Sequence, residues 1–163
     1  MSISIHAVKT AVFTLLVPLI VAGVVPQRMR RGSPIIANLP ALIVGGLLVI
    51  AGVAGYLWCA ALFVQAEGTP APLTPTKRTV IGGPYCFNRN PMYTSVLAVV
   101  FGQAVLYGSA RITLYGAMLL LGFHLFVVFY EEPTLRRKFN GEYEEFCRRV
   151  PRWLPRLPPA RRS

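Results

Sequence analysis

Hydrophobic residues in this chain gather in long uninterrupted runs. Residues 12–27 and 35–65 contain no charged side chain, and in residues 112–130 His124 is the single group that could carry charge near neutral pH. A fourth uncharged run covers residues 92–110. Because a helix needs about 20 apolar residues to cross the hydrocarbon core of a bilayer, the pattern predicts an all-α polytopic membrane protein with about four transmembrane helices.

Cap and turn residues divide the second half of the chain. Asn90-Pro91 is typical of a helix start, and Gly108-Ser109 interrupts the apolar pattern. We therefore expect a helical hairpin over residues 91–130. Beyond Glu132-Pro133, apolar residues recur every three or four positions among charged ones, which predicts an amphipathic helix that lies on the membrane surface or caps a site. This apolar set is Leu135, Phe139, Tyr143 and Phe146. Residues 150–155 end that helix, with Trp153 as an expected interface anchor.

The first half predicts two further spans, over residues 8–25 and about 36–66. Pro18 lies inside the first, where neighbouring helices can satisfy the carbonyl that a proline frees. The glycines of the second permit close helix packing; they are Gly45, Gly46, Gly52 and Gly55. Residues 67–89 are rich in Gly and Pro and predict an irregular loop. We divide the chain into amino-terminal helices, residues 1–66, and a second region, residues 67–163.

Composition agrees with lipid as the solvent, since 54% of the 163 residues are hydrophobic and 14% are charged, against roughly 25% charged in soluble domains. The net charge of +11 does not indicate nucleic-acid binding, because the basic residues lie in loops and tail without the pattern of a nucleic-acid module. With four spans, thirteen basic residues fall on one side and four on the other. The positive-inside rule then places both termini in the cytoplasm, although the basic cluster at residues 28–31 opposes it.

Other classes of site leave no pattern here. The three cysteines, Cys59, Cys86 and Cys147, lack the spacing of a metal site, so we expect no metal. The first apolar stretch has no small-residue cleavage pattern after it, so we interpret it as a retained span rather than a signal peptide. The sequence carries no signal for an oligomeric state.

Two polar groups interrupt the apolar pattern at what should be one face of the membrane. Arg89-Asn90 opens one predicted span and Glu131-Glu132 closes the next. Adjacent positions on a helix lie about 100° apart, so we expect Glu131 to face inward and Glu132 to be solvated. His124, seven residues before Glu131, shares its face; a functional role and a hydrogen bond to a neighbouring helix explain it equally well.

Five motifs in this order resemble the isoprenylcysteine carboxyl methyltransferase family, whose wider grouping includes membrane phospholipid N-methyltransferases. They are Gly83-Pro84-Tyr85, residues 89–93, Glu131-Glu132, Phe139-x-Gly141-Glu142-Tyr143 and Val150-Pro151-Arg152. The resemblance implies a membrane enzyme that uses S-adenosylmethionine to methylate a lipophilic acceptor. By motif position it implies cofactor contacts at Lys77, Arg78, Thr79, Val80, Tyr85, Asn90, Pro91, Met92, Tyr93 and Glu131.

Two departures from the family's pattern bear on the site. Asn90 stands where the family often has histidine, and Val127 stands where the prenylcysteine enzymes have a substrate-facing arginine. The candidates for the substrate side are Val127, Arg89, His124 and Arg152. Taken alone, Arg89 is better interpreted as a membrane-flanking charge and Asn90-Pro91 as a helix cap. The acceptor could be an isoprenylcysteine-like carboxylate, another lipid-soluble molecule or a phospholipid amine. A nicotinamide-dependent membrane reductase and a non-enzymatic scaffold are further alternatives.

Methyl transfer from a sulfonium is an in-line displacement, so the enzyme need supply no nucleophile. It must hold donor and acceptor about 3 Å apart and exclude water. A carboxylate such as Glu131 suits the ammonium or the ribose hydroxyls of the cofactor. Asn90 and the backbone N–H groups at a helix start suit its carboxylate. Tyr85 and Tyr93 offer aromatic faces to a cation or a purine. The polar cluster and the acidic pair therefore fit the methyl-donor site that the resemblance implies.

Overall fold

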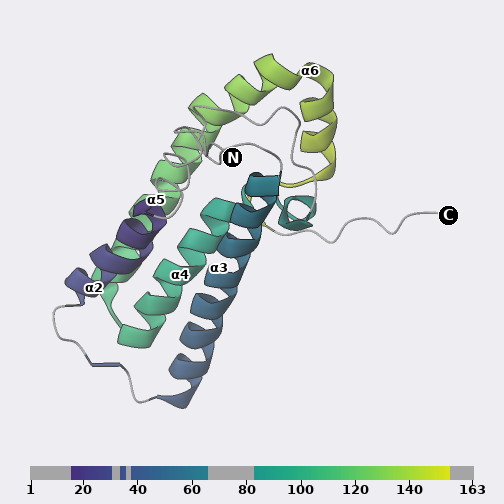
Figure 1. The fold of residues 1–163 in the computed structure, drawn as a ribbon. Helices are drawn as coiled ribbons and strands as arrows, with labels where there is room; N and C mark the ends of the chain where they lie inside the picture. Colours follow the sequence, from purple (N-terminus) through teal and green to yellow (C-terminus); the bar gives the residue numbers. More distant parts are fainter. Residues whose placement is uncertain (1–15, 31–33, 36–37, 66–82, 155–163) are drawn as a thin grey trace, which may run out of the picture.

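The computed structural model describes residues 16–30, 34–35, 38–65 and 83–154, and this part of the chain contains helices and no strand. The α-helices are α2 (Val25–Met29), α3 (Leu39–Gln65), α4 (Pro91–Tyr107), α5 (Ala110–Phe126) and α6 (Glu132–Arg149). Two π-helical turns, η1 (Leu19–Val24) and η3 (Val127–Glu131), and one 3-10 turn, η2 (Gly83–Cys86), complete the order. Helices α3, α4 and α5 run side by side, and α6 lies at one end of them (Figure 1). The all-α prediction is confirmed for these residues.

Two helical stretches are long and apolar enough to cross a membrane, Leu39–Leu62 and Ala110–Phe139. The other predicted spans correspond to shorter apolar helices, Leu16–Met29 and Pro91–Tyr107. Residues 8–15, where the first span was expected to begin, lie outside the described residues. The prediction of about four spans is therefore confirmed for two of them.

Large apolar side chains point away from the protein along α3 and α5. The exposed fraction is 68% for Ile50 and 66% for Met118, and it reaches 74% for Phe129 of η3. Soluble proteins rarely expose continuous apolar faces of this kind. These faces fit contact with lipid tails.

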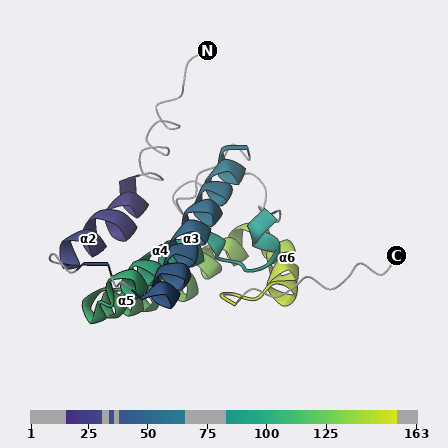
Figure 2. The same ribbon diagram turned by 90° about the horizontal axis from the view of Figure 1, so that it is seen from below.

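Helices α3 and α4 pack closely because glycines face the partner backbone. A Cβ at Gly52 would lie 2.6 Å from the Ser95 carbonyl oxygen, and one at Gly102 would lie 2.8 Å from the Gly45 carbonyl oxygen. The close contact predicted for the α3 glycines is confirmed for Gly45, Gly52 and Gly55. It is wrong for Gly46, where an added Cβ would meet open space. Viewed from below, α3 lies across α4 while α2 stands to one side (Figure 2).

The predicted hairpin is formed by α4 and α5. Gly108 ends α4 in the left-handed conformation, with φ of +53°, which glycine adopts without steric cost. The Ser109 hydroxyl then accepts the Ile112 N–H and caps α5. The turn therefore reverses the chain within two residues.

In the first helix, Leu16–Met29, two carbonyls near Pro26 accept hydrogen bonds from side chains of α4 and α5 rather than from backbone N–H groups. The Val25 N–H bonds the Ile20 carbonyl in the π-helical turn η1, and Pro26 has no N–H. The carbonyls of Val21 and Ala22 instead accept the Tyr115 hydroxyl and the Gln103 side-chain amide. The structure shows this compensation at Pro26, whereas the carbonyl that Pro18 would free, at residue 14, lies outside the described residues.

The chain stays helical from α5 through η3 into α6, across Pro133. The Glu132 N–H bonds the Val127 carbonyl, five residues back. A proline in a regular helix lacks a donor and clashes with the preceding turn, and the wider turn before Pro133 makes room for its ring. The predicted amphipathic helix is thus continuous with the hairpin, and it bends so that its last part runs back toward the other helices (Figure 1).

Candidate functional site

The start of α4 meets the end of the hairpin at Tyr93 and Glu131. The Tyr93 hydroxyl donates a hydrogen bond to Glu131 Oε2 at 3.0 Å. The Tyr93 ring packs against Phe123 of α5, with the ring centroids 4.8 Å apart. The expectation that the asparagine–proline corner and the first glutamate share one end of the helices is therefore confirmed.

The expectation that Glu132 is solvated is wrong, because only 6% of this residue is exposed. Arg152 binds both of its carboxylate oxygens, with Nε 2.7 Å from Oε1 and Nη2 3.0 Å from Oε2. Arg89 Nη1 lies 3.0 Å from Oε1. The helix passes between Tyr93 on one side and the two arginines on the other, so adjacent glutamates both face protein groups. Bidentate pairing with Glu132 raises the pKa of Arg152, so this cation persists at any physiological pH.

Arg89 and Asn90 tie the start of α4 to the chain that follows α6. Arg89 donates its backbone N–H to the Pro151 carbonyl at 2.9 Å, and its Nη1 also contacts the Cys147 sulfur at 2.9 Å. Asn90 Nδ2 donates to the Arg152 carbonyl at 3.0 Å. The Asn90 side chain makes no capping bond to α4, so the helix-cap interpretation does not account for its amide. Arg89 likewise has more contacts than a membrane-flanking charge requires.

His124 lies deeper in α5 and accepts a hydrogen bond at Nδ1 from Trp153 Nε1, at 3.1 Å. The hydrogen-bond explanation of His124 is thus observed, although the donor comes from the tail rather than from a neighbouring helix. Trp153 was expected to anchor the chain at the membrane interface; its half-buried ring packs beside His124, and the interface role stays a prediction. Val127, one turn beyond His124, is 1% exposed and lies in the core. Its proposed contact with substrate stays a prediction.

A second cluster joins η2 to α3 and α6. Its buried members are Cys59, Tyr85, Tyr143, Phe146 and Val150, with Met92, Leu135 and Phe139 packed against them. The predicted apolar stripe of α6 therefore packs on the protein and helps to close this end. Burial raises the pKa of the Tyr85 and Tyr143 phenols, which keeps both neutral.

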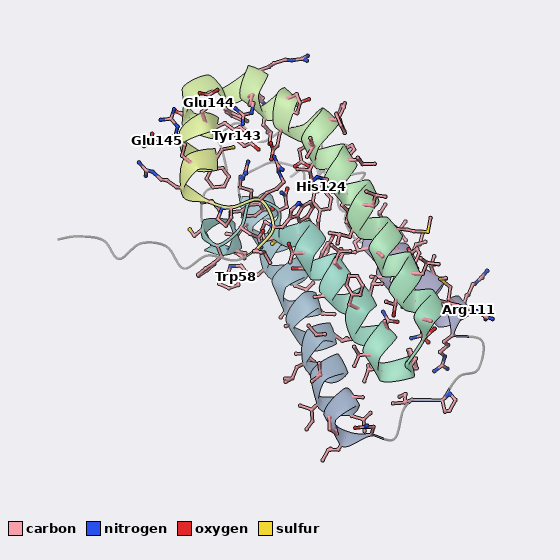
Figure 3. All side chains as sticks on the ribbon, turned by 180° about the vertical axis from the view of Figure 1, so that it is seen from behind. Trp58, Arg111, His124, Tyr143, Glu144 and Glu145 are labelled. Atoms are coloured by element: carbon pink, nitrogen blue, oxygen red, sulfur yellow. The ribbon has the colours of Figure 1, made fainter. Side chains whose placement is uncertain are left out.

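The η2 turn reaches α3 closely because Gly83 lacks a side chain. Gly83 adopts a φ of +61°, and a Cβ there would lie 2.9 Å from Leu62 Cδ1 and 3.2 Å from Trp58 Nε1. Trp58 is on α3 beside this turn (Figure 3). A glycine is therefore required where the family-like Gly83-Pro84-Tyr85 motif begins.

The structure brings most predicted site residues together at one end of the hairpin, far from Arg111 at the other (Figure 3). Pro91 is buried, and Met92 contacts the second cluster. Lys77, Arg78, Thr79 and Val80 lie outside the described residues, so their cofactor contacts stay predictions. The contacts of Glu132, Cys147 and Trp153 at this end were not predicted from the sequence. Of these, Glu132 carried a signal, since an acid next to a second acid at the end of an apolar span needs a partner.

A sequence model of the phospholipid methyltransferase family matches residues 40–142, which is 103 of the 163 residues. The chain belongs to the phospholipid methyltransferase family. No curated protein and no solved structure matches the chain. The match begins in α3 and ends within α6, so it includes η2, the start of α4 and both glutamates.

Membership of the phospholipid methyltransferase family identifies the chain as a membrane methyltransferase, and S-adenosylmethionine is the methyl donor that such a family implies. The resemblance to the wider isoprenylcysteine and phospholipid grouping is confirmed, whereas the isoprenylcysteine branch in particular is not. The exposed apolar faces of α3 and α5 fit a membrane location.

Proposed function

We propose that this member of the phospholipid methyltransferase family transfers a methyl group from S-adenosylmethionine to a lipid-soluble acceptor at the end of the hairpin where Tyr93 meets Glu131. The 3.0 Å bond between these two residues is the observation that carries the proposal. It joins the two motifs that the cofactor would have to contact together. Both motifs lie inside the matched part of the chain.

The residues at this end suit the cofactor's chemistry. Within the described residues, Tyr93 occupies one carboxylate oxygen of Glu131, so the other oxygen can accept from an ammonium group or a ribose hydroxyl. Tyr93 and Phe123 form an aromatic pair beside that carboxylate, which suits a purine or a sulfonium cation. Tyr85, Asn90, Pro91 and Met92 would complete the cofactor contacts, with Lys77 to Val80 contributing from the preceding loop.

When bound, S-adenosylmethionine would supply an electrophilic methyl group. The protein's task is then to hold and orient the two reactants and to keep water away. Glu131 and Tyr93 would orient the donor, and the second cluster around Tyr85 and Phe146 would exclude water from that end. No side chain need form a bond to the methyl group.

We further propose that the chain crosses the membrane four times, with the site and both termini in the cytoplasm. Helix α4 has 17 residues, which is at the short end of the range of about 17–25 that can span a bilayer. The excess of basic residues on the side of α6 supports the orientation. The acceptor would then reach the site laterally from the bilayer, and the donor from the cytosol.

Three acceptors are compatible with the proposal: a carboxylate, as in an isoprenylcysteine-like molecule, the amine of a phospholipid, or another lipid-soluble molecule. The chain has no arginine at position 127, and the valine there is buried. Arg89 and Arg152 both pair with Glu132. An acceptor carboxylate would therefore have to share cations that already have a partner, which favours an amine or another lipid-soluble acceptor. Deprotonation of an amine would fall to a glutamate or a water chain.

Ligand binding separates this proposal from the reductase and scaffold alternatives. We expect S-adenosylmethionine and S-adenosylhomocysteine to bind the detergent-purified protein in calorimetry, and NADPH not to bind. Binding of NADPH alone would contradict the proposal in favour of a reductase. Absence of heat with all three would favour a scaffold.

Product chemistry identifies the acceptor class. Membrane extract and methyl-labelled S-adenosylmethionine would be incubated with the protein, and the lipid product treated with mild base. A methyl ester releases its label as methanol, whereas an N-methyl group keeps it. We expect a base-stable product; label released by base would point to a carboxylate acceptor.

A further inference from the structure

The chain leaves α6 at Val150 and runs back over the hairpin as a short non-helical segment, residues 150–153. Val150 has φ of −115° and ψ of 125°, which is the extended conformation that a following proline imposes. Because Pro151 has no N–H, the helix cannot continue through it. We call these four residues, Val150 to Trp153, the C-terminal strap.

Polar contacts tie the C-terminal strap to three separate parts of the fold. Pro151 and Arg152 accept hydrogen bonds through their carbonyls from Arg89 and Asn90 at the start of α4. The Arg152 guanidinium binds Glu132, at the start of α6, with two hydrogen bonds. The Trp153 indole donates to His124 of α5. These five bonds come from three consecutive residues, and the next residue, Leu154, is 80% exposed.

The positions of these contacts bracket the Tyr93–Glu131 pair. Arg152 contacts the helix at residue 132, just beyond Glu131, while Trp153 contacts it at residue 124, about 12 Å deeper at 1.5 Å per residue. The contacts from Arg89 and Asn90 hold α4 one turn before Tyr93. The strap therefore clamps both helices that carry the pair.

We propose that the C-terminal strap holds the methyl-donor site in register, with Arg152 and Trp153 as positioning residues that act through Glu132 and His124. This inference rests on the proposed function, since it concerns the same site. Neither residue needs to contact the donor. Each residue instead fixes the position of a helix beside Glu131, whose carboxylate would contact the donor.

Conservative variants of the full-length protein test the strap. Arg152→Lys keeps the charge but loses the bidentate geometry, and Trp153→Phe keeps an aromatic ring but loses the N–H donor. We expect S-adenosylmethionine to bind about tenfold more weakly to Arg152→Lys, and about threefold more weakly to Trp153→Phe, which loses one neutral hydrogen bond. Arg148→Lys and Leu154→Ala are matched controls, because both side chains are exposed, and both should bind like the unaltered protein.

A double-mutant cycle distinguishes positioning through His124 from a general loss of structure. If Trp153 acts through His124, then Trp153→Phe should weaken binding in the unaltered protein and should add nothing in a His124→Leu protein. Independent, additive losses would overturn the role assigned to Trp153. The same cycle with Arg152→Lys and Glu132→Gln tests Arg152.

Fluorescence gives a readout that needs no cofactor. The sequence has two tryptophans, so a Trp58→Phe protein reports on Trp153 alone. We expect Arg152→Lys to increase quenching of this emission by acrylamide at least twofold. Unchanged quenching together with unchanged donor affinity would overturn the strap. If the unaltered protein binds no S-adenosylmethionine, the proposed function fails. The quenching comparison still shows whether Arg152 holds the strap, and with it Trp153, against the hairpin.

Discussion

Tyr93 and Glu131 form the contact on which the candidate site depends, and they invite a direct test. Glu131→Gln removes the negative charge that would attract an ammonium or ribose hydroxyl. We expect the affinity for S-adenosylmethionine to fall at least tenfold, about 1.4 kcal/mol, as measured by calorimetry. Glu142→Gln changes an exposed acid of α6 and should leave the affinity unchanged. Equal effects of the two variants would remove Glu131 from the site.

Glu132 has a different role, since two guanidinium groups surround it. Glu132→Gln would leave both cations without a carboxylate at a position where little water enters. Removal of one partner from a buried ion pair costs about 3 kcal/mol, so we expect a clear fall in the thermal unfolding temperature in detergent. The control is Glu144→Gln, because the Arg136–Glu144 pair is about half exposed and should contribute less than about 1 kcal/mol. A similar small shift for both would show that water screens the Glu132 pair.

At the residue scale, the sequence predicted which polar groups lie at the same end of the helices, but not which residue each of them pairs with. The Asn90–Pro91 corner and Glu131 were placed correctly, because caps and acids at the ends of apolar runs have few positions available. The burial of Glu132 was not predicted. Adjacent helix residues lie about 100° apart, and we expected only one face of the helix to contact the protein. Contacts from Cys147 and Trp153 could not be predicted, because they depend on how the chain returns after α6.

At the element scale, the first helix docks on the hairpin through backbone carbonyls that Pro26 leaves free. Gln103→Leu removes the amide that bonds the Ala22 carbonyl and should lower stability by about 1–3 kcal/mol, the cost of an unsatisfied buried group. Pro26→Ala restores a backbone donor, so the loss from Gln103→Leu should be smaller in that background. Thermal unfolding of the four proteins in one detergent gives the comparison. An equal loss in both backgrounds would mean that Gln103 acts by packing alone.

Helix boundaries near glycine and proline were predicted closely, whereas the character of the long helix was not. Asn90-Pro91 and Gly108-Ser109 bound α4 as expected, since each has strong local preferences. No pattern in the sequence indicated that α5, η3 and α6 are continuous. A proline normally suggests a break, and here a π-helical turn accommodates Pro133. Tertiary contacts on both sides of that turn decided the outcome.

At the scale of the whole molecule, the polar contacts of the site gather at one end and the apolar faces run along the sides. The orientation that we propose puts that end in the cytoplasm. A membrane-impermeant maleimide should label Arg148→Cys from the cytoplasmic side and Ala110→Cys from the opposite side, in a protein that lacks Cys86 and Cys147. Both positions are exposed in the structure. Sealed vesicles of known sidedness give the measurement. Labelling of both cysteines from the same side would contradict the proposal that the chain crosses the membrane between residues 110 and 148.

The π-helical turn η3 also constrains how this chain can vary in length. It holds one residue more than a regular turn would need, so it works as a built-in insertion between the lipid-facing helix and the helix that closes the site. Loss of a single residue there would leave a regular α-helical turn, in which the Pro133 ring would clash with the preceding turn. The helix would have to kink or break before α6, which would displace Glu132 from its arginines. Working relatives should therefore tolerate length changes elsewhere far better than between residues 127 and 131.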